Sequence, residues 1–286
     1  MRSVGTLAVL AAVGWAACGQ VAINEVAWGG TNASPYHEWV ELVNLSDQAV
    51  DLTGWTLTWE GVTIPLGEES GAVVLLRRTT IEPHGFFLLE RSRDDTVVGR
   101  EADLIYTGAL VNRGDVVSLL DPTGKVVDTA NRGCAEGWWA GAPGVSMERV
   151  APHFPDGRFA WRDGTAGELI DAKGNPIVGS PGSENAAYSS SPRVELAPPQ
   201  GRDGRVWVVE WQAVDPDNPA QELTVQLNLS RDGGKTWTPL AESLPPAGLY
   251  EWDAATEEPG AVLLAAVATD PQGNWGAAWQ ELRLPQ

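Results

Sequence analysis

Period-two alternation of apolar and polar side chains is the feature that most constrains the fold of this chain. It runs through residues 21–28 and 37–44, which are separated by the turn-forming stretch Gly29–Pro35. Alternation of this kind indicates half-buried β-strands. We expect strands over 21–28, 37–44, 55–59, 72–77, 85–90, 115–120, 125–129 and 145–150. With 32 glycines, 20 prolines and no lasting helical period, the sequence predicts an all-β fold.

Two of these segments are continuous apolar runs rather than alternating ones. Val73–Leu76 and Phe86–Leu89 are short and flanked by glycine. Runs of this length favour strands over helices. We therefore predict that both are central strands, shielded on both faces.

Seven short strings, taken in order, resemble a lamin-tail domain. This domain is the immunoglobulin-like sandwich of nuclear lamins, and it also occurs in many bacterial envelope proteins. The strings are Ile23–Trp28, His37–Asn44, Asp51–Leu57, Gly108–Asp115, Asp121–Asp128, Ser146–Val150 and the closing Gly179–Asn185. The resemblance implies a β-sandwich over residues 19–185.

A second domain is expected after a short linker. Residues 186–192 are small and polar and end in proline, which is typical of a linker. Residues 193–286 contain seven or so strand-like segments and resemble a fibronectin type III-like, immunoglobulin-like module. Within it, Ser230–Trp237 turns at Asp-Gly-Gly and resembles an Asp-box hairpin, a motif whose role is structural.

The N-terminus has the pattern of an export signal. Residues 1–18 hold one arginine and an apolar core that is too short to span a bilayer, and they end at Cys18. Small residues before a cysteine resemble a bacterial lipoprotein signal, which implies that Cys18 is lipidated and anchors the chain to a membrane. The alternative is a plain secretory signal and a soluble secreted protein. An unlipidated Cys18 and Cys134 are then able to form a disulfide.

The charge balance argues against a nucleic-acid partner. The formal net charge is −19. Binding to phosphate backbones depends on clustered lysine and arginine. Arg77-Arg78 is one of only two close basic pairs, and the other, Arg91 and Arg93, is crowded by acidic residues.

No catalytic motif is present, and we predict no catalytic residue, cofactor or metal. The three histidines are isolated, and neither a His-Glu-x-x-His nor a Gly-x-Ser-x-Gly pattern occurs. Glu38 and Glu41 are three apart, so a strand places them on opposite faces. We expect one to be solvated and the other bonded to a loop. Calcium at the strand-end residues Asp215, Asp217 and Asp270 stays an open alternative.

Fourteen tryptophans are the most unusual feature of the composition. Those in strand patterns are candidates for the cores: Trp28, Trp39, Trp55, Trp207, Trp211 and Trp252. Others are candidate ligand-binding residues, because exposed aromatic side chains stack on sugars or anchor partners. These are Trp138, Trp139, Trp275 and Trp279.

These observations favour a non-catalytic protein of the bacterial cell envelope. We expect an interaction or tethering module that presents a surface to another envelope protein. One alternative is a carbohydrate- or cell-wall-binding module that uses exposed tryptophans. A second is an accessory subunit of a secreted nuclease or phosphatase, which the resemblance implies because lamin-tail domains often sit beside such enzymes.

Overall fold

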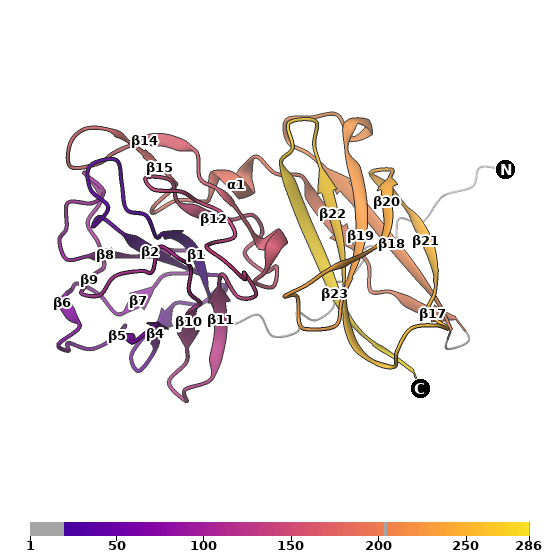
Figure 1. The fold of residues 1–286 in the computed structure, drawn as a ribbon, viewed down its shortest axis with the longest axis horizontal. Coiled ribbons are helices and arrows are strands. Elements are labelled where there is room, and N and C mark those ends of the chain that lie inside the picture. The colour runs from indigo at the N-terminus through magenta and orange to yellow at the C-terminus, as the bar shows by residue number, and fades with distance from the viewer. Residues whose placement is uncertain (1–19, 203–204, 286) are drawn as a thin grey trace.

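The chain folds into two β-sandwiches that lie side by side, as the computed structural model shows for residues 20–202 and 205–285 (Figure 1). The predicted all-β class is confirmed. The predicted signal peptide and Cys18 lie outside the described residues. Within the described ranges, no helix combines the length and the apolar character that crossing a bilayer requires.

The first sandwich packs a seven-stranded sheet against a four-stranded sheet. The larger sheet runs in the order β13 (Trp161–Asp163), β12 (Met147–Arg149), β1 (Val21–Ala27), β2 (Trp39–Asn44), β8 (Phe86–Arg91), β9 (Leu104–Tyr106) and β6 (Val73–Leu76). The smaller has the order β11 (Val126–Ala130), β10 (Val117–Leu120), β4 (Thr56–Trp59) and β5 (Val62–Pro65). Two short pairs, β3 (Val50–Asp51) with β7 (Thr80–Ile81) and β14 (Ala166–Ile170) with β15 (Pro176–Val178), complete it.

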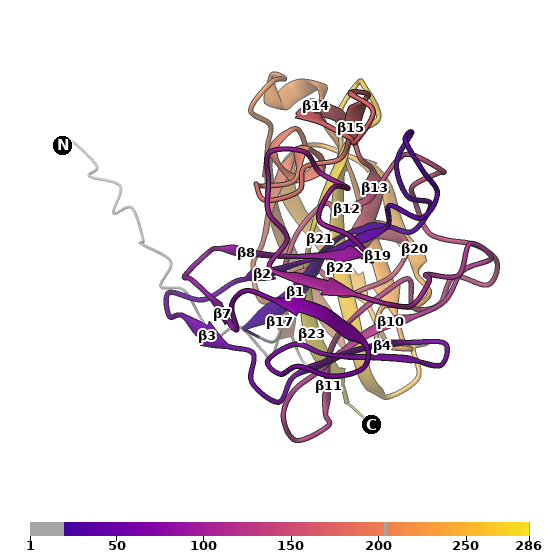
Figure 2. The same ribbon diagram turned by 90° about the vertical axis from the view of Figure 1, so that its left-hand side faces the viewer.

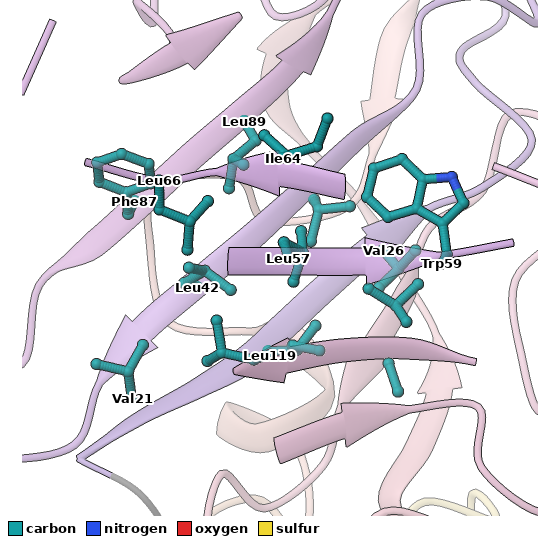
Figure 3. Packing of buried hydrophobic residues seen from close by; sticks show 14 of the residues in the cluster. Val21, Val26, Leu42, Leu57, Trp59, Ile64, Leu66, Phe87, Leu89 and Leu119 are labelled. Carbon is teal, nitrogen blue, oxygen red and sulfur yellow. The ribbon is translucent and has the colours of Figure 1, made fainter. Parts of the chain in front are cut away.

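The core of this sandwich lies between the two sheets (Figure 3). Val26, Leu42 and Phe87 project from the larger sheet toward Leu57 and Leu119 of the smaller one, and all five are 0% exposed. Burial of each such side chain contributes about 1.5–3 kcal/mol. This core accounts for one face of the alternating strands.

The other face of β1 and β2 is also covered, which the alternation did not predict. Every residue of both strands is buried. The polar positions of β1, Asn24 and Glu25, are therefore enclosed rather than solvated. What covers them is the segment after β13, which folds back over the outer face of the sheet.

The two continuous apolar runs occupy different positions in the seven-stranded sheet. Phe86–Leu89 forms the central strand β8, and residues 87–89 are fully buried, so this prediction is confirmed. Val73–Leu76 forms β6, which is the edge of the seven-stranded sheet. Val74 is 56% exposed and Leu75 is 39% exposed. The prediction of a central strand there was wrong, because a run of apolar residues does not reveal whether another strand lies beyond it.

The second sandwich consists of two four-stranded sheets. One contains β16 (Arg193–Leu196), β17 (Gln200–Arg202), β18 (Val206–Val214) and β21 (Ala247–Asp253). The other has the order β20 (Thr238–Leu244), β19 (Thr224–Ser230), β22 (Gly260–Thr269) and β23 (Trp275–Leu284). Val209, Trp211, Leu227, Trp252 and Leu264 form its core.

The junction between the sandwiches is packed. The predicted linker contains a short helix, α1 (Ala186–Ser189), whose Ala187 is only 2% exposed. In the hairpin 230–237, Asp232 accepts hydrogen bonds from the N–H and hydroxyl of Thr236, at 3.0 and 2.7 Å. This places Trp237 against Phe154 of the first sandwich, with ring centroids 5.7 Å apart. Figure 2 shows the first sandwich in front of the second.

Candidate interaction groove

Three glutamates lie side by side on the outer face of the seven-stranded sheet. Glu25 of β1 stands opposite Glu148 of β12 on one side and opposite Glu41 of β2 on the other. Opposed residues of antiparallel strands point to the same face, with Cβ atoms about 5 Å apart. All three are 0% exposed. We call Glu148, Glu25 and Glu41 the carboxylate ladder.

Burial dominates the electrostatics of this ladder. It raises the pKa of Glu41 to about 8, against the lowering effect of hydrogen bonds from Asn24 and Gly182. The pKa of Glu25 is raised well above its ordinary value by burial first, and then by the charges of Glu148 and Glu41. Burial also raises the pKa of Glu148. The ladder therefore holds protons at neutral pH, because three adjacent buried carboxyls do not all ionise.

Residues 179–187, which we call the capping loop, supply hydrogen-bond donors to the ladder. The N–H of Ser180 donates to Glu25 at 3.1 Å, and its hydroxyl donates to Glu148 at 2.6 Å. Ala187 N–H donates to Glu148 at 2.7 Å, and Gly182 N–H donates to Glu41. The buried carboxyls are thus paired, as buried polar groups must be, and the loop is held against the sheet.

Two glycines let the capping loop approach this closely. A Cβ on Gly179 would lie 2.2 Å from a carboxyl oxygen of Glu25. Gly182 has a φ of 84°, and a Cβ there would lie 2.0 Å from Nε of Arg100. A side chain at Gly179 would displace the carboxyl of Glu25, and one at Gly182 would displace the guanidinium of Arg100. The closing Gly-Ser-Pro-Gly string of the sequence therefore has a direct physical reason.

The capping loop forms one wall of a groove in the described part of the chain. This groove has a volume of about 1080 Å³. The other walls are the segments 99–103 and 165–169 and the two arginines that follow β6, Arg77 and Arg78. Three arginines, Arg77, Arg78 and Arg100, therefore line one groove on a strongly acidic protein.

Two of the three arginines are already paired. Arg77 donates to Asp94 at 2.5 Å and to the carbonyl of Ala102 at 2.7 Å. Arg78 donates to both carboxylate oxygens of Asp103, at 2.6 and 2.9 Å. These bonds fix the two side chains on the groove wall and neutralise much of their charge.

Arg100 is different. Within residues 20–202 and 205–285 its guanidinium has no ion pair, and its Nε is shielded from solvent without a hydrogen-bond partner. It lies over Gly182 and favours the ionised form of Glu41 through its charge. A guanidinium presents paired N–H donors that match the oxygens of a carboxylate or another oxyanion. The rim carries Glu101, Glu168 and Glu184, so the groove suits a segment with an acidic group at its centre and basic groups around it.

Glu38 and Glu41 lie on opposite faces of the sheet, as their spacing predicts, but neither is solvated. Glu38 is 3% exposed, accepts a 2.8 Å hydrogen bond from Arg91, and accepts another of 2.8 Å from the N–H of Leu110. Burial raises its pKa to about 7. The expectation that one of the pair is solvated was wrong, because loops far along the chain cover both faces.

The candidate tryptophans of the first sandwich are half-buried and hydrogen-bonded. Trp138 stacks on Trp28 at 5.8 Å between ring centroids, and its indole N–H donates to the carbonyl of Val111 at 3.0 Å. Trp139 donates to the carbonyl of Arg132 at 3.2 Å. Both residues therefore help to hold the loop 131–144 against the sandwich.

The other two candidate tryptophans lie at the junction. Trp275 donates to the carbonyl of Phe159 at 3.2 Å, and Trp279 donates to that of His153 at 2.9 Å. Both bonds cross from β23 to the first sandwich. These half-buried side chains therefore help to join the two sandwiches. None of the four candidate tryptophans lines the groove of Arg100.

The strand-end aspartates shape their own turns. Asp215 accepts hydrogen bonds from the backbone N–H groups of Asp217 and Asn218, at 2.8 and 2.7 Å. Asp270 accepts from the N–H and the amide of Asn274, both at 2.7 Å. Among the described residues, no group of three or more acidic, histidine or cysteine side chains is placed to hold a metal.

Cys134 is half-buried and is a free thiol within the described chain. It donates weakly to the carbonyl of Glu136, with Sγ and O 3.4 Å apart. Burial raises its pKa, which makes it a poor nucleophile at neutral pH.

Residues 15–133 match the sequence profile of the Lamin Tail Domain family. The matched part of the first sandwich is a lamin-tail domain. The matched stretch contains β1 to β11. β12 and β13 lie beyond it, yet they extend the same sheet through β1. The carboxylate ladder and the capping loop therefore join the matched region to the residues that follow it.

The chain was also compared with solved structures and with curated proteins. A crystal structure described as a tetra-tandem repeat in the extending region of a large adhesion protein is 14% identical, with a TM-score of 0.22. The alignment covers 93% of this chain and 50% of that one, so the chain spans half the length of the structure it matches. A likeness at this level carries no argument. No curated protein matches the chain.

The groove residues gave only a partial signal in the sequence. Arg77 and Arg78 are visible as one of two close basic pairs, but nothing in the spacing links them to Arg100 or to the Gly-Ser-Pro-Gly string about 80 residues further on. The link exists only through the fold, because the capping loop crosses the sheet that both parts flank.

Proposed function

We propose that this chain is a non-catalytic tethering module of the bacterial cell envelope. In this proposal a lipid on Cys18 anchors the chain to a membrane, and the groove contacts a segment of a partner protein. The observation that supports it best is Arg100, which has no ion pair among the described residues and lies in a groove whose walls are held by buried hydrogen bonds. A groove fixed in advance loses little conformational entropy when a partner binds.

The non-catalytic part of the proposal is supported by where the buried acids lie. The ladder carboxyls are enclosed beneath the capping loop. Glu90 accepts from the N–H groups of Thr96 and Val97, both at 3.1 Å. A general acid or base must reach a substrate atom within about 3 Å. In the described chain these carboxyls are bonded to the protein's own backbone instead.

The groove part is tested by reversing one charge. The full chain, carrying an affinity tag, is cross-linked in cells of the source organism and co-purified with its partner. Arg100→Glu is expected to reduce the recovered partner about tenfold, because a repulsive pair replaces a charge-assisted hydrogen bond. The matched control is Arg202→Glu, which changes an exposed arginine of the second sandwich and leaves the groove intact. Equal recovery from wild type and Arg100→Glu would overturn the groove assignment.

The anchoring part has its own test. Mass spectrometry of the N-terminal peptide from isolated membranes is expected to find Cys18 as the first residue, carrying lipid. The variant Cys18→Ser is expected to leave the membrane fraction, because the acyl chains supply the anchoring free energy, at about 0.8 kcal/mol per buried methylene. An unmodified Cys18, or a protein cleaved beyond it, contradicts lipidation.

A further inference from the structure

A second, smaller concavity lies where the two sandwiches meet. Its volume is about 250 Å³, room for about eight waters at ~30 Å³ each. The first sandwich contributes residues 126–129, Arg132 and residues 153–156, and the second contributes Gly233, Leu263 and Trp279. Ligand pockets occur preferentially at such domain boundaries. This one has room for a single small ring.

Arg132 brings a positively charged guanidinium to the pocket. Its backbone N–H donates to Asp156 at 2.7 Å, which fixes the main chain. Its guanidinium has no ion pair in the described chain, and its Nε is shielded from solvent with no hydrogen-bond partner. A Cβ added to Gly233 would lie 3.2 Å from an Nη of Arg132, so this glycine keeps the guanidinium uncrowded.

The two aspartates that line the pocket already accept hydrogen bonds from the protein. Asp156 accepts from the hydroxyl of Thr129, from two backbone N–H groups and from the indole of Trp161. Asp128 uses Oδ2 for Arg149 at 2.8 Å and for a backbone N–H. Asp128 is itself part of the pocket lining. A carboxylate at this wall is able to accept a hydrogen bond from a ligand hydroxyl.

Trp279 supplies the apolar part of the pocket. Its indole N–H is fixed by the 2.9 Å hydrogen bond to the carbonyl of His153, so the ring itself forms part of the wall. Burial lowers the pKa of His153 to about 4. Its imidazole is therefore neutral at physiological pH, and Arg132 is the cationic side chain of the pocket lining.

We propose that this pocket binds one carboxylate-bearing sugar ring. The indole of Trp279 contacts the apolar face of the ring, the guanidinium of Arg132 binds the carboxylate, and Asp128 accepts a hydrogen bond from a hydroxyl. Arg132 and a planar carboxylate form the paired hydrogen bonds that a neutral sugar lacks. This site is separate from the groove of Arg100 and does not depend on the function proposed for it.

Isothermal titration calorimetry of the full chain with glucuronate tests the proposal. Glucose, which lacks the carboxylate, is the uncharged control. Glucuronate is expected to bind saturably and about tenfold more tightly than glucose, the preference that one charge-assisted pair provides. Arg132→Gln is expected to abolish that preference, because it removes the guanidinium and keeps the backbone bond to Asp156. Arg205→Gln, which changes an exposed arginine paired with Asp253, is the control and is expected to bind like wild type.

A second variant removes the space rather than the charge. Leu263 is half-buried and lines the pocket, so Leu263→Trp is expected to fill it and to abolish binding of both sugars. Saturation-transfer NMR with the same sugars detects contact between sugar and protein without relying on the heat of binding. The proposal is overturned if wild type binds neither sugar, if it binds the two equally, or if binding survives both Arg132→Gln and Leu263→Trp.

Discussion

Raising the pH from 5.5 to 9 is expected to lower the free energy of unfolding of the lamin-tail sandwich. In the unfolded chain glutamate titrates near 4.3, whereas burial raises the folded pKa of Glu41 to about 8. Between these values the folded state binds more protons than the unfolded state. The stabilisation is therefore fully present below about pH 4.3 and is lost as the pH rises through about 8. Glu38 and Glu90, each with a pKa raised to about 7, act in the same direction.

The variant Glu25→Gln isolates the contribution of the ladder. Glu25 is the middle member, with a carboxyl neighbour on each side. Two unit charges about 5 Å apart repel by ~3 kcal/mol at an effective dielectric constant near 20. Replacing the middle carboxyl removes two such repulsions at pH 9. The amide also loses charge assistance in its bond with Ser180, which costs about 1–2 kcal/mol. We expect Glu25→Gln to be about 4–5 kcal/mol more stable than wild type at pH 9, and within about 1 kcal/mol of it at pH 5.5.

Urea unfolding at pH 5.5, 7, 8 and 9, followed by tryptophan fluorescence, measures this difference. Glu281→Gln is the matched control, because it makes the same chemical change at an exposed position of β23. Its curve is expected to follow that of wild type at every pH. The reasoning is refuted if the stabilities of wild type and Glu25→Gln run parallel across the pH range, or if wild type becomes more stable as the pH rises.

Three further substitutions test the packing around the two sites. Asp103→Asn breaks the paired bonds from Arg78 and is expected to destabilise the first sandwich by about 3 kcal/mol in urea unfolding. Trp237→Ala removes the ring that packs on Phe154 and is expected to cost about 3 kcal/mol; faster proteolysis at residues 186–192 reports the loosened junction. Asp232→Ala removes the acceptor that closes the 230–237 hairpin and is expected to lower stability by about 2 kcal/mol, measured in the same way.

Much of the fold was predictable from local pattern. Strands β1, β2, β4, β8, β10, β11 and β12 fall where the alternation or the apolar runs place them. Short strands without a clear period, such as β9 and β13, were missed. Three residues are too few to show a period, and these strands exist because their neighbours offer hydrogen bonds.

The carboxylate ladder was beyond local pattern. In an alternating strand, Glu25 and Glu41 occupy the positions that normally face water. They are buried because the capping loop, 155 residues along the chain from Glu25, lies over them. Periodicity reports which side of a strand is polar, and it contains no information about a distant segment that covers the polar side.

The junction shows the same limit for tryptophan. Trp275 and Trp279 lie on β23 at positions that the isolated second sandwich would leave open to solvent, so the sequence marks them as ligand contacts. In the folded chain both donate hydrogen bonds to backbone carbonyls of the first sandwich. Domain docking depends on surfaces that form only after both sandwiches have folded, and no motif in either half encodes it.

Site-specific photo-cross-linking tests the proposed function most directly. A photoreactive amino acid replaces Glu168 or Glu184 on the rim of the groove, or Glu210 on the second sandwich as the control; all three positions are exposed. In cells, both rim positions are expected to yield the same partner adduct, which the control does not yield and which disappears when Arg100→Glu is added. An adduct that persists with Arg100→Glu, or that forms equally from Glu210, would contradict the assignment of this groove as the contact surface.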